Sequence, residues 1–256
     1  MALISVHGCP LGRLGSKDVG GMSVYVHQLA LGLGRLGFEV DIYTRDHGPH
    51  ESSIINLGDN VRVVHLVAGP VGAAKEDLYK YLPEFLLQVK IFVQRHLLSY
   101  DIVHSHYWLS GWVGQALVRD WGVSHLVTFH TLAEIKTRAR IGEGEGEARS
   151  LTEHRLVSTA DRIIASTYHE LGELQHLYHA TASNISVIPA GVDLNVFMPG
   201  DRQAARAQLG LDDVLTILYV GRFEAIKGLE VLLYALTSLE VSGRFRLLVA
   251  GGGTPM

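Results

Sequence analysis

Short apolar runs rich in β-branched residues alternate with longer stretches of helical periodicity along this chain of 256 residues. Residues 214–220 are apolar on both faces, which is typical of a strand buried on both sides of a parallel sheet. Alternating strands and helices predict an α/β fold with a mainly parallel sheet. The pattern predicts strands at 2–7, 38–44, 61–67, 101–105, 125–129, 162–167, 184–189, 214–220 and 245–250, and helices at 20–36, 76–98 (kinked by Pro83), 109–121, 148–159, 168–178, 201–209 and 227–239.

The alternation of strands and helices is interrupted at residues 191–200, a linker with turn-forming residues at both ends, and it resumes after this linker. We therefore predict a first domain over 1–192, a linker with a connecting helix over 193–212, and the start of a second domain over 213–256. Two strands and one helix cannot bury a doubly wound core by themselves. We expect the second domain to be incomplete, the chain being truncated at its carboxyl end, or to pack on the first domain or a partner.

Composition excludes several classes of protein. Apolar residues make up 47% of the chain and charged residues 19%, which indicates a globular protein with a core. A net charge of −4 without a long basic run argues against nucleic acid as a partner. The single cysteine, Cys9, excludes an internal disulfide and a Cys-rich zinc site, and indicates a reducing cytoplasm. No signal peptide is visible, and the longest uncharged stretch, 102–118, is too short for a membrane span.

A strand that runs into two cations carries the strongest functional signal. Gly221 ends the strand at 214–220, and Arg222 and Lys227 follow at or near the start of the next helix. Backbone N–H groups and the helix dipole favour an anion at such a place. The arrangement suits a diphosphate.

A long glycine-rich loop follows the first strand and ends with Gly20 and Gly21 at the opening of a helix. Ligands of open α/β sheets bind outside the carboxyl ends of the strands, and glycine lets backbone N–H groups approach a phosphate. The loop is neither the dinucleotide fingerprint nor a Walker loop, which argues against a nicotinamide-dependent oxidoreductase. Anion binding and an ordinary loop with a glycine N-cap both stay open.

Histidines stand at two further strand ends. His104 and His106 point to the same face and so suggest a metal pair, but polar side chains at a strand end are favoured because no third ligand stands at suitable spacing. Tyr107 and Trp108 are placed to wall a sugar or phosphate site. His130 is a general base, a residue that orients a substrate hydroxyl, or a residue that caps the next helix. We predict no metal site.

Three cations stand near these strand ends, namely Lys75, Lys136 and Arg149. Each alone is most often a solvated surface charge. Together on one rim they would clamp a phosphorylated substrate, but the sequence does not show that they converge.

Several of these motifs occur together, in order, in one known family. They are His7, the run Asp-Val-Gly-Gly-Met-Ser-Val-Tyr at 18–25, and the segments 104–108, 130–133, 187–193, 221–222 and 227–228. In this order they resemble the retaining glycosyltransferases of family 4, above all those that act on D-inositol 3-phosphate, with sucrose-phosphate synthases as more distant relatives. The resemblance covers the whole chain.

The resemblance implies the GT-B fold, here a complete amino-terminal Rossmann-like domain for the acceptor and the first part of a second for the nucleotide sugar. It implies transfer of a sugar, from a UDP-sugar in particular, to a small phosphorylated polyol or sugar. The anomeric configuration would be retained by a same-face route without a protein nucleophile. It implies no cofactor, does not indicate Mg²⁺ and is compatible with a homo-oligomer. The alternative is a catalytically incomplete fragment that binds an acceptor or a partner chain.

The resemblance also implies roles for single residues. Arg222 and Lys227 would hold the donor diphosphate and act in catalysis. Gly20 and Gly21 would approach that diphosphate from the facing domain, and His130 would be a catalytic residue beside the transferring sugar. The acceptor and its phosphate would correspond to His7, Asp18, Ser23, Lys75, Tyr107, Thr131 and Arg149.

The chain departs from the D-inositol 3-phosphate glycosyltransferases at a few positions. Ser23 stands where they carry asparagine, and Arg13-Leu14 replaces their Gln-Pro. The family's donor-site glutamates and its ribose- and base-binding segment would lie beyond Met256.

Overall fold

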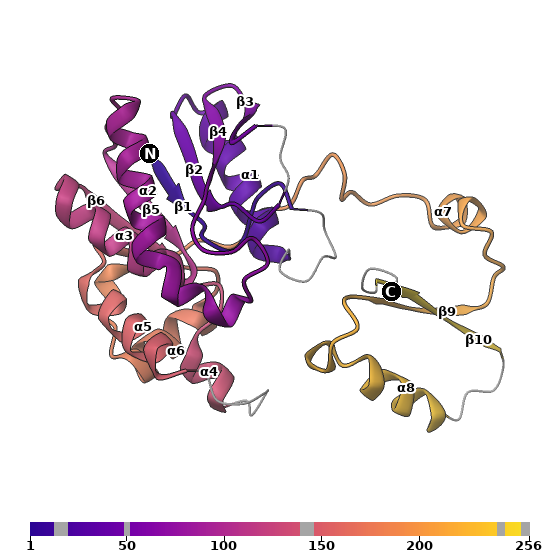
Figure 1. The fold of residues 1–256 in the computed structure, drawn as a ribbon. Coiled ribbons are helices and arrows are strands. Elements are labelled where there is room, and N and C mark those ends of the chain that lie inside the picture. The colour runs from indigo at the N-terminus through magenta and orange to yellow at the C-terminus, as the bar shows by residue number, and fades with distance from the viewer. Residues whose placement is uncertain (13–19, 49–51, 139–145, 240–243, 252–256) are drawn as a thin grey trace. The chain divides into compact units, whose positions relative to one another are not determined.

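The computed structural model describes residues 1–12, 20–48, 52–138, 146–239 and 244–251 (Figure 1). The chain divides into two compact units, with the main boundary between Ala190 and Gly191. The first unit carries a large sheet and the second carries a pair of strands, and each is described by itself.

The first unit is built on an eight-stranded sheet with the order β3-β4-β2-β1-β5-β6-β7-β8. All neighbouring strands in it are parallel except β3, which runs antiparallel to β4. The predicted α/β class with a mainly parallel sheet is confirmed. The strands are β1 (Ala2–Ile4), β2 (Val40–Arg45), β3 (Ile54–Gly58), β4 (Val61–Leu66), β5 (Ile102–His106), β6 (Ser124–Thr128), β7 (Arg162–Ala165) and β8 (Ile185–Val187).

Helices cover both faces of this sheet, because successive residues of a strand point to opposite sides. Leu3 and Ile42 share a buried cluster with Val26 of α1. Their neighbours Ile4 and Tyr43 belong to another cluster, together with side chains of α2 and α3. The helices of this unit are α1 (Gly21–Arg35), α2 (Leu82–Arg95), α3 (Tyr107–Trp121), α4 (Ala133–Arg138), α5 (Glu147–Thr159) and α6 (Tyr168–Tyr178), with the 3-10 helices η1 (Lys75–Tyr81) and η2 (Ala182–Asn184).

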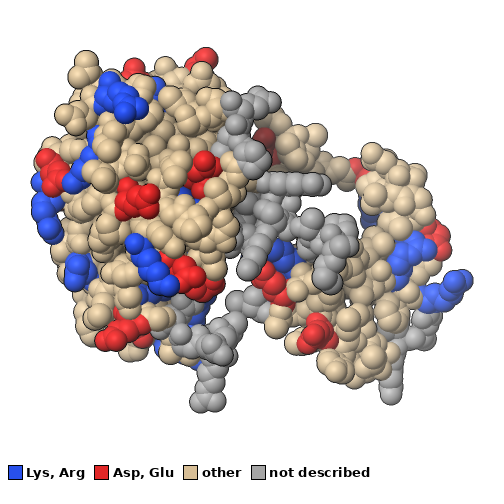
Figure 2. Space-filling model, viewed as in Figure 1, with Lys and Arg blue, Asp and Glu red and all other residues tan. Residues whose placement is uncertain are grey.

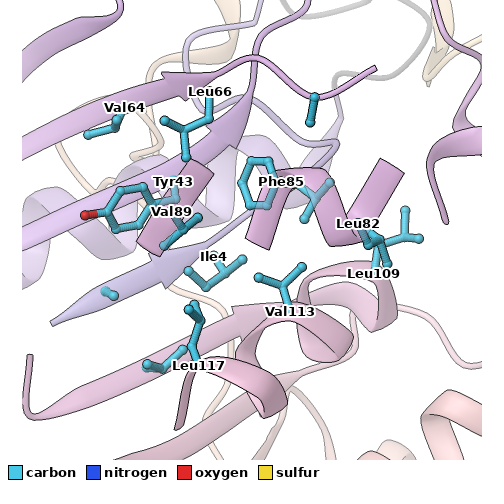
Figure 3. Close-up of a cluster of buried hydrophobic side chains, with 14 of the residues drawn as sticks. Ile4, Tyr43, Val64, Leu66, Leu82, Phe85, Val89, Leu109, Val113 and Leu117 are labelled. Carbon is cyan, nitrogen blue, oxygen red and sulfur yellow. The ribbon is translucent and has the colours of Figure 1, made fainter. Parts of the chain in front are cut away.

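Figure 3 shows the cluster under α2 and α3, where Phe85 and Val89 meet Ile4 and Tyr43 of the sheet. Phe85 has no exposed surface. Truncating such a side chain to alanine typically costs about 3–5 kcal/mol, so this cluster is a main source of the stability of the first unit. A separate cluster joins β6, β7 and β8 to α5 and α6.

The structure differs from the prediction at three elements: β3, the short helix α4, which was not predicted either, and the helix expected over 76–98. The antiparallel strand β3 was not predicted, because its five residues include Asn56 and a terminal glycine and show little periodicity. It precedes a turn at Asp59 and Asn60, where Asn60 has a φ of 61°. The helix predicted over 76–98 is in fact η1 followed by α2, because Pro83 lacks an N–H group and fits only the first turn of a helix.

The second unit contains α7 (Arg202–Gln208), β9 (Leu215–Val220), η3 (Ala225–Lys227), α8 (Leu229–Thr237) and β10 (Phe245–Ala250). Strands β9 and β10 are parallel and form a two-stranded sheet. Several of its large apolar side chains are exposed, among them Leu218, Val231 and Tyr234. Two strands and one helix therefore bury little apolar surface, as the sequence predicts.

Lys, Arg, Asp and Glu are interspersed on the face drawn in Figure 2. Nucleic-acid-binding proteins usually gather their cations on one face, and the described residues of this view show no such gathering. Among the described residues, no helix combines the length and the apolar character that crossing a membrane requires.

Candidate active site

Three parallel strands of the first unit end side by side at one edge of the sheet. In the register, Ile4 of β1 lies opposite Ser105 of β5, and His106 at the end of β5 lies opposite Thr128 at the end of β6. The carboxyl edge of a parallel sheet is where open α/β proteins bind their ligands. The side chains that follow these three strands therefore form the candidate active site.

A cluster of imidazoles lies at this edge. His106 Nδ1 is 3.1 Å from His130 Nε2, so one ring donates its N–H and the other accepts it. The ring of Tyr25, from α1, meets both of them edge-on, with centroids 5.9 Å and 5.2 Å away. His104 pairs instead with the Thr128 hydroxyl, at 2.9 Å from Nε2. Within the described part of the chain, neither His104 nor His106 belongs to a three-ligand group that could hold a metal ion.

These imidazoles are neutral near pH 7. Burial lowers the pKa of His130 to about 4. Burial, with the neighbouring His130 and His125, lowers the pKa of His104 to about 3, and burial also lowers that of His106 well below its usual range. A base with a pKa of about 4 accepts a proton poorly near neutrality. The geometry therefore favours His130 as a group that orients a hydroxyl by hydrogen bonding.

The helix-capping interpretation of His130 finds little support. The first N–H groups of α4 are satisfied by other side chains: Ala133 N donates to Glu153 Oε2 at 2.8 Å, and Glu134 N donates to Tyr178 Oη at 3.1 Å. His130 has a φ of 62°, a left-handed conformation that typically costs about 1–3 kcal/mol outside glycine. Such strain persists where the surroundings fix the residue, here through His106.

Two of the three predicted cations converge on one aromatic ring. Lys75 Nζ lies 4.5 Å from the ring centroid of Tyr107, and Arg149 Cζ lies 4.9 Å from it. The ring of His7 packs on the same tyrosine, with centroids 4.6 Å apart. Burial lowers the pKa of His7 well below its ordinary range, and the charges of Lys75 and Arg149 lower it further. Lys136 lies on α4.

A buried ion pair positions Arg149. Its Nε donates to Glu153 Oε1 at 2.7 Å, and the two side chains are only 3% and 0% exposed. Its Nη2 donates to the carbonyl and to the hydroxyl of Thr131, at 2.9 Å and 3.1 Å. Glu153 also accepts a hydrogen bond of 2.6 Å from Tyr178. Burial raises the pKa of Glu153, and Arg149 opposes that shift.

The amino-terminal end of α1 carries two glycines. Among the described residues, no atom lies within 4 Å of the position where a Cβ on Gly20 or Gly21 would stand, and no side chain caps the helix. Backbone N–H groups at such an end favour an anion. Ser23, one turn further on, is buried, and its Oγ has no hydrogen-bond partner among the described residues. Asp18, predicted to belong to this site, lies outside the described residues.

The second unit holds the two remaining predicted residues. Arg222 Nη1 forms an ion pair with Glu224 Oε1 at 2.8 Å, both side chains being more than a third exposed. Lys227 ends η3 and is exposed, and Gly228 opens α8 without a side-chain cap. Gly221 and Gly251 stand where β9 and β10 end, and a Cβ on Gly251 would come within 1.8 Å of the Gly221 carbonyl oxygen. Both cations therefore follow the carboxyl end of β9, near an uncapped helix start.

Sequence reasoning missed three participants. Tyr25 stands four residues after Gly21, one helical turn from the open end of α1. Glu153 stands four residues after Arg149, a spacing that places a carboxylate beside a guanidinium on a helix and was available as a signal. The Tyr178 hydroxyl, 2.6 Å from Glu153, carries no local signal because it comes from another helix.

Comparison with known proteins identifies the family. Residues 19–196 match the profile of Glycosyltransferase Family 4. The chain belongs to this family. The matched region contains His130, Arg149 and the start of α1, and so most of the site just described.

The curated relatives include D-inositol 3-phosphate glycosyltransferases. That of Corynebacterium efficiens is 40% identical over 263 residues, which cover 98% of this chain and 62% of the relative. That of Mycobacterium sp. (strain KMS) is 44% identical over 259 residues, covering 98% of this chain and 58% of the relative. The chain thus spans about three fifths of the length of these curated relatives.

Solved structures agree on the fold. Sucrose-phosphate synthase from Thermosynechococcus elongatus is 34% identical, with a TM-score of 0.90 over 99% of this chain and 62% of that chain. HepE from Anabaena, solved with UDP and glucose, has a TM-score of 0.66 at 14% identity, over 97% of this chain and 59% of that chain, and shares the fold. The structural neighbours are GT-B glycosyltransferases, and the predicted fold class is confirmed.

Proposed function

We propose that the protein is a retaining glycosyltransferase, and that this chain carries its acceptor site together with the first donor-binding cations. The sugar would come from a nucleotide diphosphate sugar, in particular a UDP-sugar, and the acceptor would be a small phosphorylated polyol or sugar. One observation carries the proposal: Lys75 and Arg149 converge on Tyr107 beside His7, at the carboxyl edge of the sheet.

Charge is the first argument for a phosphorylated acceptor. Cations held on an aromatic face, with a guanidinium fixed by a buried carboxylate, form a rigid positive rim. A guanidinium stays charged and carries several N–H donors, so it binds phosphate oxygens well. Ser23 lies at the α1 end of the same edge, with a buried hydroxyl that a ligand oxygen would satisfy.

The second argument concerns the transfer step. The bond between the anomeric carbon and the diphosphate oxygen breaks, and negative charge builds on the departing phosphate. In our proposal Arg222 and Lys227 stabilise that charge. Removing one contact of this kind typically costs about 3 kcal/mol, or roughly a hundredfold in rate.

The third argument concerns protons. In the proposed same-face route the acceptor hydroxyl bonds to the anomeric carbon, and its proton passes to the departing phosphate. No protein nucleophile is needed, and a neutral His130 fits this route because it orients a hydroxyl without taking its proton. We propose no cofactor.

Calorimetry on the 256-residue chain tests the acceptor site. D-inositol 3-phosphate should bind, and inositol without the phosphate should bind far more weakly. Lys75→Gln should weaken binding of the phosphate ester by about 10- to 100-fold, because a hydrogen bond to a charged group is worth about 1.5–3 kcal/mol. Lys80→Gln is the matched control, since Lys80 lies on the same 3-10 helix and pairs with Asp77 in solvent. Equal affinities for ester and polyol would contradict the proposal.

A second titration separates transfer from binding alone. If UDP also binds and a UDP-sugar yields a glycosylated acceptor, the chain carries enough of the donor site for catalysis. Acceptor heat without nucleotide heat would favour a binding fragment, and Arg222→Ala and Lys227→Ala would then have to be tested in a longer chain. Unchanged turnover in both variants there would defeat the donor assignment.

A further inference from the structure

A sulfur and two imidazoles that are not among the residues assigned to the transfer site lie close together. Cys9, His47 and His65 each bring one potential ligand atom, and the three atoms lie within 4.8 Å of one another. Within the described residues, they form the group of His, Cys, Asp or Glu side chains that is close enough to hold a metal ion. None of these three side chains has a role in the proposed transfer step.

The order of the strands brings the three together. Strands β4, β2 and β1 are neighbours in the sheet (Figure 1). His65 lies near the carboxyl end of β4, opposite Thr44 of β2, and His47 follows two residues after β2 ends. Cys9 follows β1, in a turn where Gly12 N donates to its carbonyl oxygen at 3.1 Å. The site therefore stands at or shortly after the carboxyl ends of three neighbouring strands.

The distances fit a tetrahedral ion. With metal–sulfur and metal–nitrogen bonds of about 2.3 Å and 2.0 Å, two tetrahedral ligands stand about 3.3–3.6 Å apart. Cys9 Sγ and His65 Nε2 are 3.4 Å apart. The ring centroids of His65 and His47 are 5.9 Å apart, and His47 is exposed, so its ring has room to complete the set by a small rotation.

We propose that Cys9, His47 and His65 bind one Zn²⁺ ion, with a fourth position open to water or another ligand. One thiolate and two imidazoles suit a borderline ion such as Zn²⁺, and they do not suit Mg²⁺ or Ca²⁺, which prefer oxygen. Three protein ligands are typical of open zinc sites. The ion would tie the turn that follows His7 to the ends of β2 and β4, and so would brace one wall of the candidate active site.

Direct binding to the 256-residue chain tests this site without any sugar substrate. The metal-free chain should bind one equivalent of Zn²⁺, and Co²⁺ in its place should give a thiolate-to-cobalt charge-transfer band. The melting temperature should rise with Zn²⁺, because a ligand that binds the folded chain stabilises it. If the cobalt band did not appear, the zinc proposal would be refuted, but the proposed glycosyltransferase function would not be affected. The two proposals can therefore be refuted independently.

Variants identify the ligands. His47→Ala should weaken binding by more than the roughly 10- to 100-fold that losing an outer-shell partner of a metal typically costs. Cys9→Ser should abolish the charge-transfer band. The control is His169→Ala, an exposed histidine on α6, which should bind as the parent chain does.

The proposal would be overturned if the parent chain bound no stoichiometric Zn²⁺, or if His47→Ala bound it with unchanged affinity. Because His47 is exposed, this variant should fold whether or not Cys9→Ser does.

Discussion

Arg149→Met should destabilise the first unit by about 3–5 kcal/mol, the usual cost of leaving one partner of a buried ion pair without the other. The Arg149 and Glu153 side chains are 3% and 0% exposed, so water cannot replace the lost guanidinium. The variant also loses the two hydrogen bonds to Thr131, whereas Tyr178 and the Ala133 N–H continue to bind Glu153.

The double variant Arg149→Met/Glu153→Leu should recover much of this loss, because replacing a whole buried pair by apolar side chains is often neutral or better.

The stability of the first unit should also depend on pH through Glu153. Burial raises the pKa of Glu153 in the folded state, so the folded chain holds that proton more tightly than the unfolded chain does. Stability from this group is present at low pH and falls as pH rises above the ordinary value of 4.5. Without Arg149 the stability should fall more steeply as pH rises. The loss of unfolding free energy caused by Arg149→Met should therefore be smaller at low pH than at neutral pH.

Urea unfolding followed by tryptophan fluorescence is a suitable assay. All three tryptophans, Trp108, Trp112 and Trp121, lie on α3, so the signal reports on the first unit. A loss below about 1 kcal/mol in Arg149→Met would refute the reasoning, since exposed pairs are worth that little. A double variant that is less stable than Arg149→Met would also refute the reasoning. The same holds if the destabilisation by Arg149→Met increases as the pH is lowered.

Three further predictions concern the first unit. An NMR titration should show His130 neutral down to about pH 5, because burial holds its pKa at about 4. The unfolded chain takes up this proton at a higher pH than the folded chain, so the free energy of unfolding should decrease as pH falls from 6.5 toward 4. Titration of His130 near pH 6.5 would contradict its burial. Phe85→Ala should cost about 3–5 kcal/mol in urea unfolding, whereas Leu87→Ala, on the exposed face of α2, should cost under about 0.5 kcal/mol; similar losses would argue against the core of Figure 3. Gly114→Ala should lower the free energy of unfolding by about 1–3 kcal/mol in thermal unfolding, because its Cβ would lie 2.0 Å from the buried Ser105 hydroxyl. Gly172→Ala, in open space on α6, should raise it by up to about 1 kcal/mol. The reverse order would contradict the close packing at Gly114.

The fold was largely predictable because it depends on periodicity. Strands β2 and β4 are rich in β-branched residues, and β5 begins with Ile-Val. The long helices have regular apolar faces. Strand β3 was not predicted because it is an edge strand in which no residue is fully buried and Asn56 interrupts the apolar residues. The break at Pro83 was read as a kink, whereas the structure has a change of helix type.

The site was predictable in its residue types and only partly in its contacts. His7, Tyr107 and His130 could be placed at strand ends, and parallel strands bring their ends to one edge. The pairing of His106 with His130 depends on the register of β5 and β6, which no local pattern sets. The group of Cys9, His47 and His65 was missed for the same reason, since its members stand 38 and 18 positions apart.

A crystal structure of the chain with D-inositol 3-phosphate tests the central claim most directly. The account predicts the phosphate beside the Tyr107 ring, with its oxygens within roughly 4 Å of Arg149 and Lys75 nitrogens. Phosphate density at another place on the first unit, with the rim around Tyr107 left to solvent, would contradict it.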